Sequence, residues 1–118
     1  MISMVLGTDM AKHFTDLGMF KSRVGNSEFK PSDPDGSDRT LSMMIVLHFA
    51  DISNPTKPWN ICQKWTELVF LEFFSQGDHE RALQMPISML MDRETVNIAK
   101  SQQGFIDFII LPSYNALT

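Results

Sequence analysis

This chain of 118 residues lacks several features that would assign it to a familiar class of protein. It has one cysteine, Cys62, so no internal disulfide forms, and such a chain is typical of a reducing compartment. Ten lysines and arginines stand against 14 acidic residues, which gives a net charge of −4. Because no basic surface is available to neutralise phosphates, we expect no nucleic-acid polymer as a partner. We expect a cytoplasmic protein.

Long apolar runs and targeting signals are also missing. The richest apolar stretches, residues 43–47 and 108–111, are far shorter than the about 20 residues needed to span a bilayer. The apolar beginning of the chain has neither the basic region nor the cleavage site of a signal peptide. It continues directly into amphipathic sequence, and the other end carries no helix stop signal. We therefore expect a piece cut from a longer protein, with no membrane segment.

Helical periodicity covers most of the chain. Of its residues 43% are apolar and 20% charged, as in an ordinary globular protein. No segment alternates with the period of two that strands require. We expect helices over residues 2–23, 37–54, 58–77 and 92–111, with a short further turn over 79–83 after a break at Gly77-Asp78. Residues 25–36 predict a surface loop, and 84–91 a loop rich in methionine. The predicted fold class is all-α.

Each predicted helix has one apolar face and a polar remainder. Ser37 or Asp38 is expected to cap the second helix. Acidic and basic residues of the third helix are expected to be solvated; they are Glu67, Glu72, Asp78, Glu80 and Arg81. The predicted buried stripe of the first helix consists of Met4, Leu6, Met10, Phe14, Leu17 and Phe20. That of the third helix consists of Cys62, Trp65, Val69 and Phe73.

Asp51 lies where the apolar stripe of the second helix ends. A carboxylate there is disfavoured by burial and by the negative end of the helix dipole, unless a cation compensates. A metal ion, an arginine or a lysine would serve, and a capping role is the simpler alternative. His48 precedes Asp51 by one turn, a spacing at which two metal ligands share a face, and the alternative is a hydrogen-bonded core histidine. Two ligands are too few for a metal site, so the others would have to come from outside this chain.

Gln102 occupies the apolar stripe of the last helix. Its amide offers donors and an acceptor together, and by rotating it would match the edges of different heterocyclic bases. Phe105, three residues later on the same face, offers a flat surface for stacking. The pair would suit a purine, and the alternative is a glutamine bonded to a neighbouring helix beside a core phenylalanine. No Gly-rich phosphate loop, cysteine pair or nucleophile elbow is present.

Five motifs in order resemble the C-terminal part of the catalytic domain of class I cyclic nucleotide phosphodiesterases. They are Met4-Val5-Leu6-Gly7-Thr8-Asp9-Met10, His48-Phe49-Ala50-Asp51-Ile52-Ser53-Asn54-Pro55, Trp65-Thr66-Glu67 with Glu72-Phe73-Phe74-Ser75-Gln76-Gly77-Asp78, Asp92-Arg93, and Ser101-Gln102-Gln103-Gly104-Phe105-Ile106-Asp107-Phe108-Ile109. The resemblance implies that residues 1–118 form a partial catalytic domain, the C-terminal helices of a larger all-α fold.

The resemblance also implies roles for individual residues. Asp51 would be a ligand of the tightly held zinc, and Gln102 would hydrogen-bond the purine edge. Phe105 would stack on one side of the base, and Val69 would close the other. Asn54 would line the base pocket, where an asparagine slightly favours cAMP over cGMP.

A second group of residues would form the walls of the same pocket. Asp9 and Met10 match a segment that forms a wall near the metals, and Leu90 falls in a loop that helps to close the pocket. Ser88-Met89 departs from the Ser-Pro that members usually have in this loop.

The reaction implied is hydrolysis of a 3′,5′-cyclic phosphate to the 5′-monophosphate. Two divalent metal ions, zinc and magnesium or manganese, would share a hydroxide for in-line attack. The other metal ligands and the general acid histidine of the family have no counterpart here, because His13, His48 and His79 do not fit their pattern. We therefore expect the 118 residues to be inactive alone and to expose apolar surface that the remaining helices of the catalytic domain would cover. The alternative is a non-catalytic helical interaction module.

Overall fold

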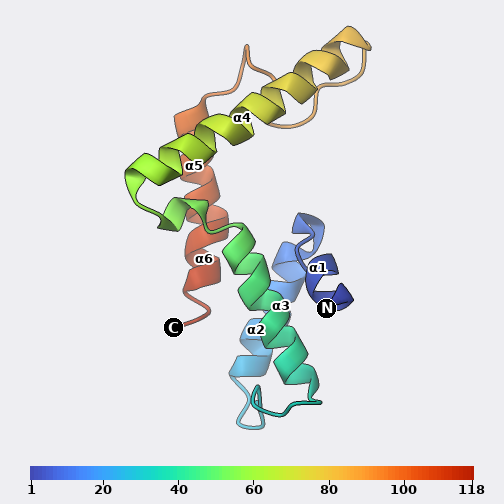
Figure 1. Cartoon of the computed structure of the whole chain (residues 1–118), viewed down its shortest axis with the longest axis vertical. Helices are drawn as coiled ribbons and strands as arrows, with labels where there is room; N and C mark the ends of the chain where they lie inside the picture. Colours follow the sequence, from blue (N-terminus) through green and yellow to red (C-terminus); the bar gives the residue numbers. More distant parts are fainter. The chain divides into compact units, whose positions relative to one another are not determined.

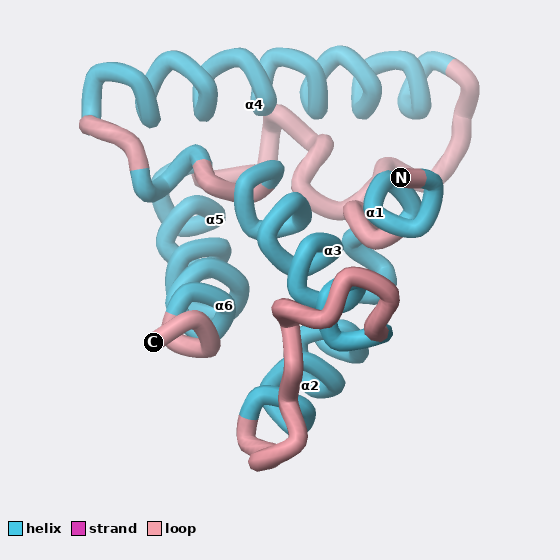
Figure 2. The backbone as a smooth tube through the Cα atoms, turned by 60° about the horizontal axis from the view of Figure 1, so that its bottom comes forward, coloured by secondary structure: helices cyan, strands magenta, loops and turns pink.

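The computed structural model describes all 118 residues as helices and connecting loops, with no strand. The chain divides into two compact units: unit 1 comprises Met1–Ser53 and Leu111–Thr118, and unit 2 comprises Asn54–Ile110. Figure 1 shows the chain coloured by residue number, and Figure 2 marks helices and loops. None of the helices is long and apolar enough to cross a membrane. The predicted all-α class is confirmed.

Unit 1 contains four α-helices and a short 3₁₀ turn. They are α1 (Ile2–Leu6), η1 (Met10–Lys12), α2 (His13–Val24), α3 (Ser37–Asp51) and α6 (Leu111–Tyr114). The prediction of one helix over residues 2–23 is wrong. Gly7 ends α1, and Asp9 then adopts an extended conformation in which its Oδ1 accepts the N–H of Ala11 at 2.9 Å. A Cβ on Gly7 would lie 2.1 Å from Cγ of Met44, so the missing side chain lets α3 approach.

Leu17, Phe20, Ile45 and Phe49 form the buried core of unit 1. Partly buried apolar residues pack around this core; they are Phe29, Leu41, Ile52, Tyr114 and Ala116. The Tyr114 hydroxyl donates to the carbonyl of Phe49 at 3.0 Å, and the two rings stack. The predicted stripe of the first helix is therefore only half right. Its earlier part is exposed; Leu6, Met10 and Phe14 are 61%, 44% and 66% accessible.

Asp38 has a different role from the predicted cap. Gly36 precedes α3, and no side chain caps the helix. The buried Asp38 carboxylate accepts hydrogen bonds from Nε and Nη2 of Arg23 at 2.6 and 3.0 Å, and from the Lys30 N–H at 3.0 Å. The Arg23 guanidinium, assisted by that N–H, holds the pKa of Asp38 below its ordinary value. The ion pair thus ties α2 and the following loop to the start of α3.

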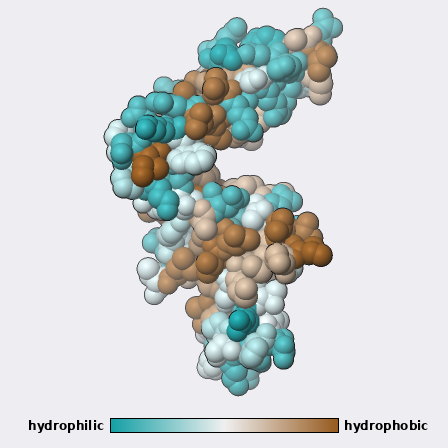
Figure 3. Space-filling view, in the orientation of Figure 1, coloured by the Kyte–Doolittle hydropathy of each residue, from teal (hydrophilic) through white to brown (hydrophobic).

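α1 and α3 leave an apolar groove between them. Its volume is about 410 Å³, and its lining residues are Met4, Ser42, Met43, Val46, Leu47 and Ala50. Ile2 and Val5 of α1 are 79% and 62% exposed. Apolar surface gathers over α1 in Figure 3. The expected exposure of apolar surface is therefore confirmed.

Two buried histidines meet in unit 1. His13 and His48 are each 1% exposed, and Nδ1 of His13 lies 2.8 Å from Nε2 of His48, a distance at which one proton is shared. The buried Ser113 hydroxyl lies 3.4 Å from Nε2 of His13. Burial and the neighbouring His48 lower the pKa of His13 below its ordinary 6.5, against a smaller opposite effect of Asp16. The folded unit therefore favours a neutral imidazole at His13.

Unit 1 should lose stability in mildly acidic solution. Between its lowered folded pKa and 6.5, the unfolded chain binds a proton that folded His13 excludes, so stability is complete above 6.5 and falls as the pH decreases. We expect a slope of up to about 1.4 kcal/mol per pH unit, measured by urea unfolding between about pH 7.5 and 5. His13→Gln should flatten this slope, whereas His79→Gln, at an exposed histidine, should retain it. An unchanged slope in His13→Gln would contradict the assignment; Asp38 acts only in a more acidic window, below its ordinary 3.8.

Unit 2 contains two α-helices, a 3₁₀ turn and a π-helical turn. They are η2 (Asn54–Thr56), α4 (Trp59–Ala82), α5 (Ile98–Phe105) and the π-helical η3 (Ile106–Ile110). The predicted break at Gly77-Asp78 is wrong, because α4, which is 24 residues long, includes both residues and ends only at Ala82. The last helix begins at Ile98 and not near residue 92. Asn97 caps it, with Oδ1 accepting the N–H of Lys100 at 3.0 Å.

The predicted stripe of the third helix is right except at Trp65. Cys62, Val69 and Phe73 are half-buried, whereas Trp65 is 60% exposed. Phe70, which was not predicted, is 2% exposed and contacts the rings of Phe73 and Phe74. The loop over residues 83–97, here called the Met loop, runs back along α4 (Figures 1 and 2). Gly77 is buried beneath it, and a Cβ there would lie 1.9 Å from the carbonyl oxygen of Met91. Gly77 is thus a site of close backbone approach and not a helix breaker.

Replacing Gly77 by alanine should destabilise unit 2. The new Cβ would overlap the Met91 backbone, and overpacking of this kind costs roughly 1–3 kcal/mol, more than the gain in helix propensity of about 0.5–1 kcal/mol. Gly18→Ala is the matched control, because a Cβ on Gly18 of α2 meets nothing within 4 Å. We expect a lower urea midpoint for Gly77→Ala and an equal or higher one for Gly18→Ala. Equal stabilisation by Gly77→Ala and Gly18→Ala would show that the backbone of Met91 does not pack closely on α4.

Candidate functional site

A chain of polar side chains joins η2, α4 and α5 in unit 2. Nδ2 of Asn54 donates to the carbonyl of Cys62 at 3.4 Å and to Oγ1 of Thr66 at 3.3 Å. The Thr66 hydroxyl donates in turn to Oε1 of Gln102 at 3.3 Å. Asn54, Thr66 and Gln102 are called the amide relay below. The structure therefore brings together two of the predicted base-binding residues, Asn54 and Gln102, through a third that sequence reasoning did not single out.

The direction of each hydrogen bond in the amide relay follows from its first member. The Cys62 carbonyl accepts only, so the group of Asn54 that faces it must be the NH₂. The same NH₂ donates to Thr66, whose single proton is then directed to Gln102. Oε1 of Gln102 consequently faces Thr66, while Nε2 keeps its donors for another partner. The amide of Gln102 is thus oriented by its neighbours, since rotation would break the bond from Thr66.

Apolar residues flank the amide relay on both helices. Val69 follows Thr66 by three residues in α4, and Phe105 follows Gln102 by three residues in α5. Residues three apart share a helix face, so both lie on the faces where the two helices are bonded. Both are half-buried, and so is Gln102. The π-helical turn η3 begins directly after Phe105, and such turns are frequent at functional sites.

Asp51 is exposed at the end of α3 in unit 1. The expectation of a carboxylate buried on the apolar stripe is therefore wrong, and His48 is the buried polar residue of that stripe. Asp9 is also exposed, as the residue before η1, and Met10 is 44% exposed. No group of three or more His, Cys, Asp or Glu side chains is placed to hold a metal ion. The metal role of Asp51 stays a prediction.

Leu90 lies in a disfavoured backbone conformation within the Met loop. Its φ of 68° places a bulky residue in the left-handed region, where residues with a Cβ are uncommon. Its side chain is 41% exposed. Gln84, near the start of the same loop, has a φ of 55°. Two such residues in one loop indicate that contacts from outside the loop hold its conformation.

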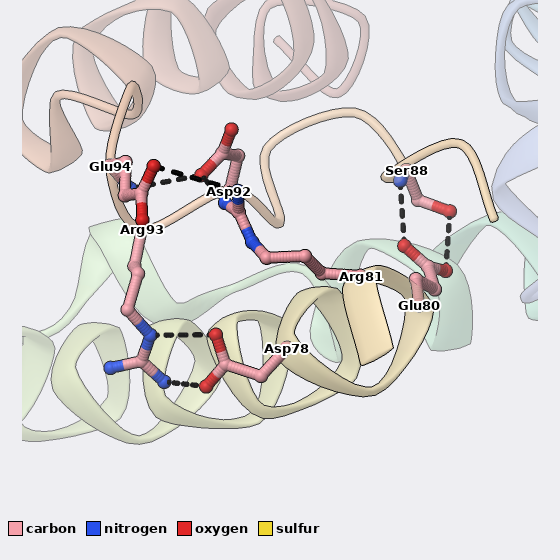
Figure 4. A network of polar contacts seen from close by, with 7 residues as sticks. All are labelled: Asp78, Glu80, Arg81, Ser88, Asp92, Arg93 and Glu94. Carbon is pink, nitrogen blue, oxygen red and sulfur yellow. Dashed lines mark hydrogen bonds and ion pairs between the residues drawn. The ribbon is translucent and has the colours of Figure 1, made fainter. Parts of the chain in front are cut away.

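Charged residues provide those contacts (Figure 4). Arg93 binds Asp78 with two hydrogen bonds, of which Nε to Oδ1 measures 2.9 Å. Arg81 donates to Asp92 at 2.7 Å. Each carboxylate oxygen of Glu80 accepts a hydrogen bond from Ser88 at 2.7 Å, one from its N–H and one from its hydroxyl.

Asp78 and Arg81 are exposed and Glu80 is half-buried, so the expectation of solvated side chains is largely met, but it missed that each of the three also binds the Met loop. The Arg93 guanidinium lowers the pKa of Asp78 and keeps it ionised. The sequence carries a signal for these contacts. Asp78 and Arg81 precede the predicted loop, and residues of opposite charge, Arg93 and Asp92, follow it.

Comparisons with known proteins identify relatives over nearly the whole chain. A probable 3′,5′-cyclic phosphodiesterase, pde-1, of Caenorhabditis elegans is 46% identical over 112 residues, which is 95% of this chain and 16% of the relative. The dual specificity calcium/calmodulin-dependent 3′,5′-cyclic nucleotide phosphodiesterase 1B of Bos taurus is 42% identical over 117 residues, 99% of this chain and 21% of the relative. The present chain thus spans less than a quarter of either relative.

A solved structure shows the same fold. LmjPDEB1 in complex with IBMX matches with a TM-score of 0.88 and 34% sequence identity, over 98% of this chain and 34% of that one. The family model described as 3′,5′-cyclic nucleotide phosphodiesterase matches residues 1–118, the full length of the chain. The chain therefore belongs to the 3′,5′-cyclic nucleotide phosphodiesterase family.

Proposed function

We propose that these residues supply the base-binding part of a phosphodiesterase that hydrolyses a 3′,5′-cyclic nucleotide to its 5′-monophosphate. The observation that carries the proposal is the amide relay, because it joins Asn54 and Gln102 across two helices and orients the Gln102 amide. An amide whose acceptor and donors have fixed directions selects among base edges; a freely rotating one accepts several.

Adenine suits this arrangement better than guanine. An amide pairs with adenine through two bonds, one from the N6 amino group and one to N7, whereas guanine presents two acceptors, N7 and O6, on the corresponding edge. Gln102 keeps its Nε2 donors and one lone pair of Oε1 free for such a pair of bonds. Phe105 and Val69 would enclose the base from its two faces. We therefore propose cAMP as the preferred substrate.

Asn54 supports the binding of a purine base at the same place. Its Oδ1 is buried and has no hydrogen-bond partner, a condition that costs about 1–3 kcal/mol unless a ligand or water provides a donor. A purine amino group is a donor of the required kind.

The metal ions of the reaction do not fit the residues of this chain alone. Asp51 is a single exposed carboxylate, and no cluster of metal-binding side chains surrounds it. We propose it as one ligand of a site for zinc and magnesium or manganese whose other ligands are absent from these residues. When bound, the two ions would activate water and polarise the phosphate. Asp9, Met10 and Leu90 are proposed as walls of the pocket.

It follows that the 118 residues bind part of the substrate but do not turn it over. The apolar groove between α1 and α3 would be covered by the remaining helices of the catalytic domain. Under the alternative function, a non-catalytic interaction module, the same groove would serve a different protein.

The proposed function predicts activity only in a completed catalytic domain. The purified chain should show no cAMP hydrolysis with zinc and magnesium. A chimaera in which residues 1–118 replace the matched segment of the Bos taurus relative should be active, with a higher kcat/KM for cAMP than for cGMP. Asp51→Asn in this chimaera should reduce both bound zinc and activity, the latter by more than the about 10–100-fold typical of residues that support a ligand. Glu72→Gln, at an exposed acid of α4, is the control.

Each result has a distinct meaning. Turnover by the 118-residue chain alone would contradict its inactivity, and an inactive but folded chimaera would favour the interaction module. Full zinc content and activity in Asp51→Asn would overturn the ligand assignment. A preference for cGMP would overturn the proposed base selectivity.

Cutting the amide relay should weaken base recognition. Thr66→Val preserves shape but removes the hydroxyl that orients Gln102, and a lost hydrogen bond of about 1–1.5 kcal/mol corresponds to a roughly 5–10-fold higher KM for cAMP. The ratio of kcat/KM for cAMP to that for cGMP should fall as the amide becomes free to rotate. Thr66→Ser retains the hydroxyl and should behave like the parent chimaera. Equal kinetics in Thr66→Val and Thr66→Ser would show that Thr66 does not orient the amide.

A further inference from the structure

We propose that Asp78 and Arg93 are positioning residues for substrate binding. Their ion pair fastens the Met loop to α4, so that Leu90 keeps its left-handed conformation and its place as a pocket wall. The part of the proposal that concerns substrate rests on the function proposed above, whereas the part that concerns the loop does not.

The anchors of the Met loop are concentrated around Leu90. On one side, Ser88 is held by both oxygens of Glu80 at 2.7 Å. On the other side, Met91 packs its backbone on Gly77, and Arg93 then binds Asp78. About two consecutive turns of α4 take part, from Phe74, over whose ring the Arg93 guanidinium lies at 5.5 Å, to Arg81, which binds Asp92. A segment fixed this closely on both sides has little freedom at its middle residue.

The conformation of Leu90 requires such anchors. A leucine at a φ of 68° is disfavoured by contact between its Cβ and the backbone, and it relaxes to negative φ when its surroundings allow. Within Ser88–Met91 the only hydrogen bond that helps to hold this conformation is that of the turn, from the Met91 N–H to the Ser88 carbonyl at 3.1 Å. The strain at Leu90 therefore depends on contacts with α4.

The ion pair of Asp78 and Arg93 is the contact between the Met loop and α4 that a single substitution removes most directly. The packing at Gly77 is backbone against backbone, so no side-chain truncation removes it. The side chains of Asp78 and Arg93 are 48% and 47% exposed, and an exposed ion pair is usually weak. Two parallel hydrogen bonds and the ring of Phe74 strengthen this one. The pair is thus strong enough to hold the loop and exposed enough to respond to salt.

A loop that serves as a wall affects binding more than the chemical step. A pocket wall contacts the nucleotide equally in the ground state and in the transition state. Its loss therefore raises KM while kcat changes little. Asp78 and Arg93 would act through Leu90 and would themselves touch neither substrate nor metal.

Hydrogen exchange tests the loop directly, in the 118-residue chain. Asp78→Asn and Arg93→Gln should each speed exchange at the Met91 and Ser88 amides by about tenfold, and the double variant should do no more than either single one, because the two residues act as a pair. Salt at about 1 M, where screening extends to about 3 Å, should speed exchange in the parent chain but not in the variants. Glu72→Gln is the control and should leave exchange unchanged. Unchanged exchange in both single variants, or additive effects in the double one, would overturn the ion pair as an anchor.

Kinetics of the chimaera test the consequence for substrate. Both single variants should raise the KM for cAMP about 5–10-fold and leave kcat within about twofold. Faster exchange with an unchanged KM would overturn the positioning role while leaving the anchor in place. A fall in kcat at constant KM would likewise overturn it. Failure of the proposed function is distinguishable, because the parent chimaera would then be inactive while the exchange results still decide on the anchor.

Discussion

The hydrogen bond from Thr66 to Gln102 is the interaction on which the candidate site depends. It links α4 to α5, and it also transmits the orientation of Asn54, which the Cys62 carbonyl fixes, to the amide that would read a base. A glutamine at this position would otherwise rotate freely and lose selectivity. Because the Cys62 carbonyl can only accept a hydrogen bond, it fixes the orientation of Asn54 and, through Thr66, that of Gln102. The Nε2 donors of Gln102 are the atoms that remain available.

Close approach of another segment to a glycine is the second constraint, and it is tightest at one glycine in each unit. Gly7 admits the Met44 side chain of α3, and Gly77 admits the backbone of Met91. The outcome for the helix differs. α1 ends at Gly7, and the following Asp9 accepts the N–H of Ala11, whereas α4 continues through Gly77, and the following Asp78 binds Arg93. A glycine followed within two residues by an aspartate is therefore ambiguous until the partner of the aspartate is known.

This ambiguity explains how far sequence predicts the fold. Helical periodicity is a property of each segment alone, so the all-α class and the extent of α3 were predictable. The break after Leu6, where Met44 packs on Gly7, and the continuity of α4 beneath Met91 coincide with contacts to distant residues and were not predicted by periodicity. The same holds for the site: Asn54 and Gln102 stand in recognisable motifs, but Thr66 is a common helix residue whose role depends on what faces it. Asp78 and Arg93 are 15 residues apart, and only the course of the Met loop brings them together.

Polar residues on apolar stripes remain a useful signal, provided that each is followed to its partner. The buried Asp38 is compensated by Arg23, Nε2 of His48 by His13, and Oε1 of Gln102 by Thr66. Asp51 needs no such compensation, because it is exposed, and burial gives no reason to expect a cation there. The uncompensated atoms are instead Nδ1 of His48 and Oδ1 of Asn54. Asn54 stands at the start of the amide relay, so the unmet Oδ1 belongs to the same hydrogen-bonded chain as the amide of Gln102, which would recognise a base.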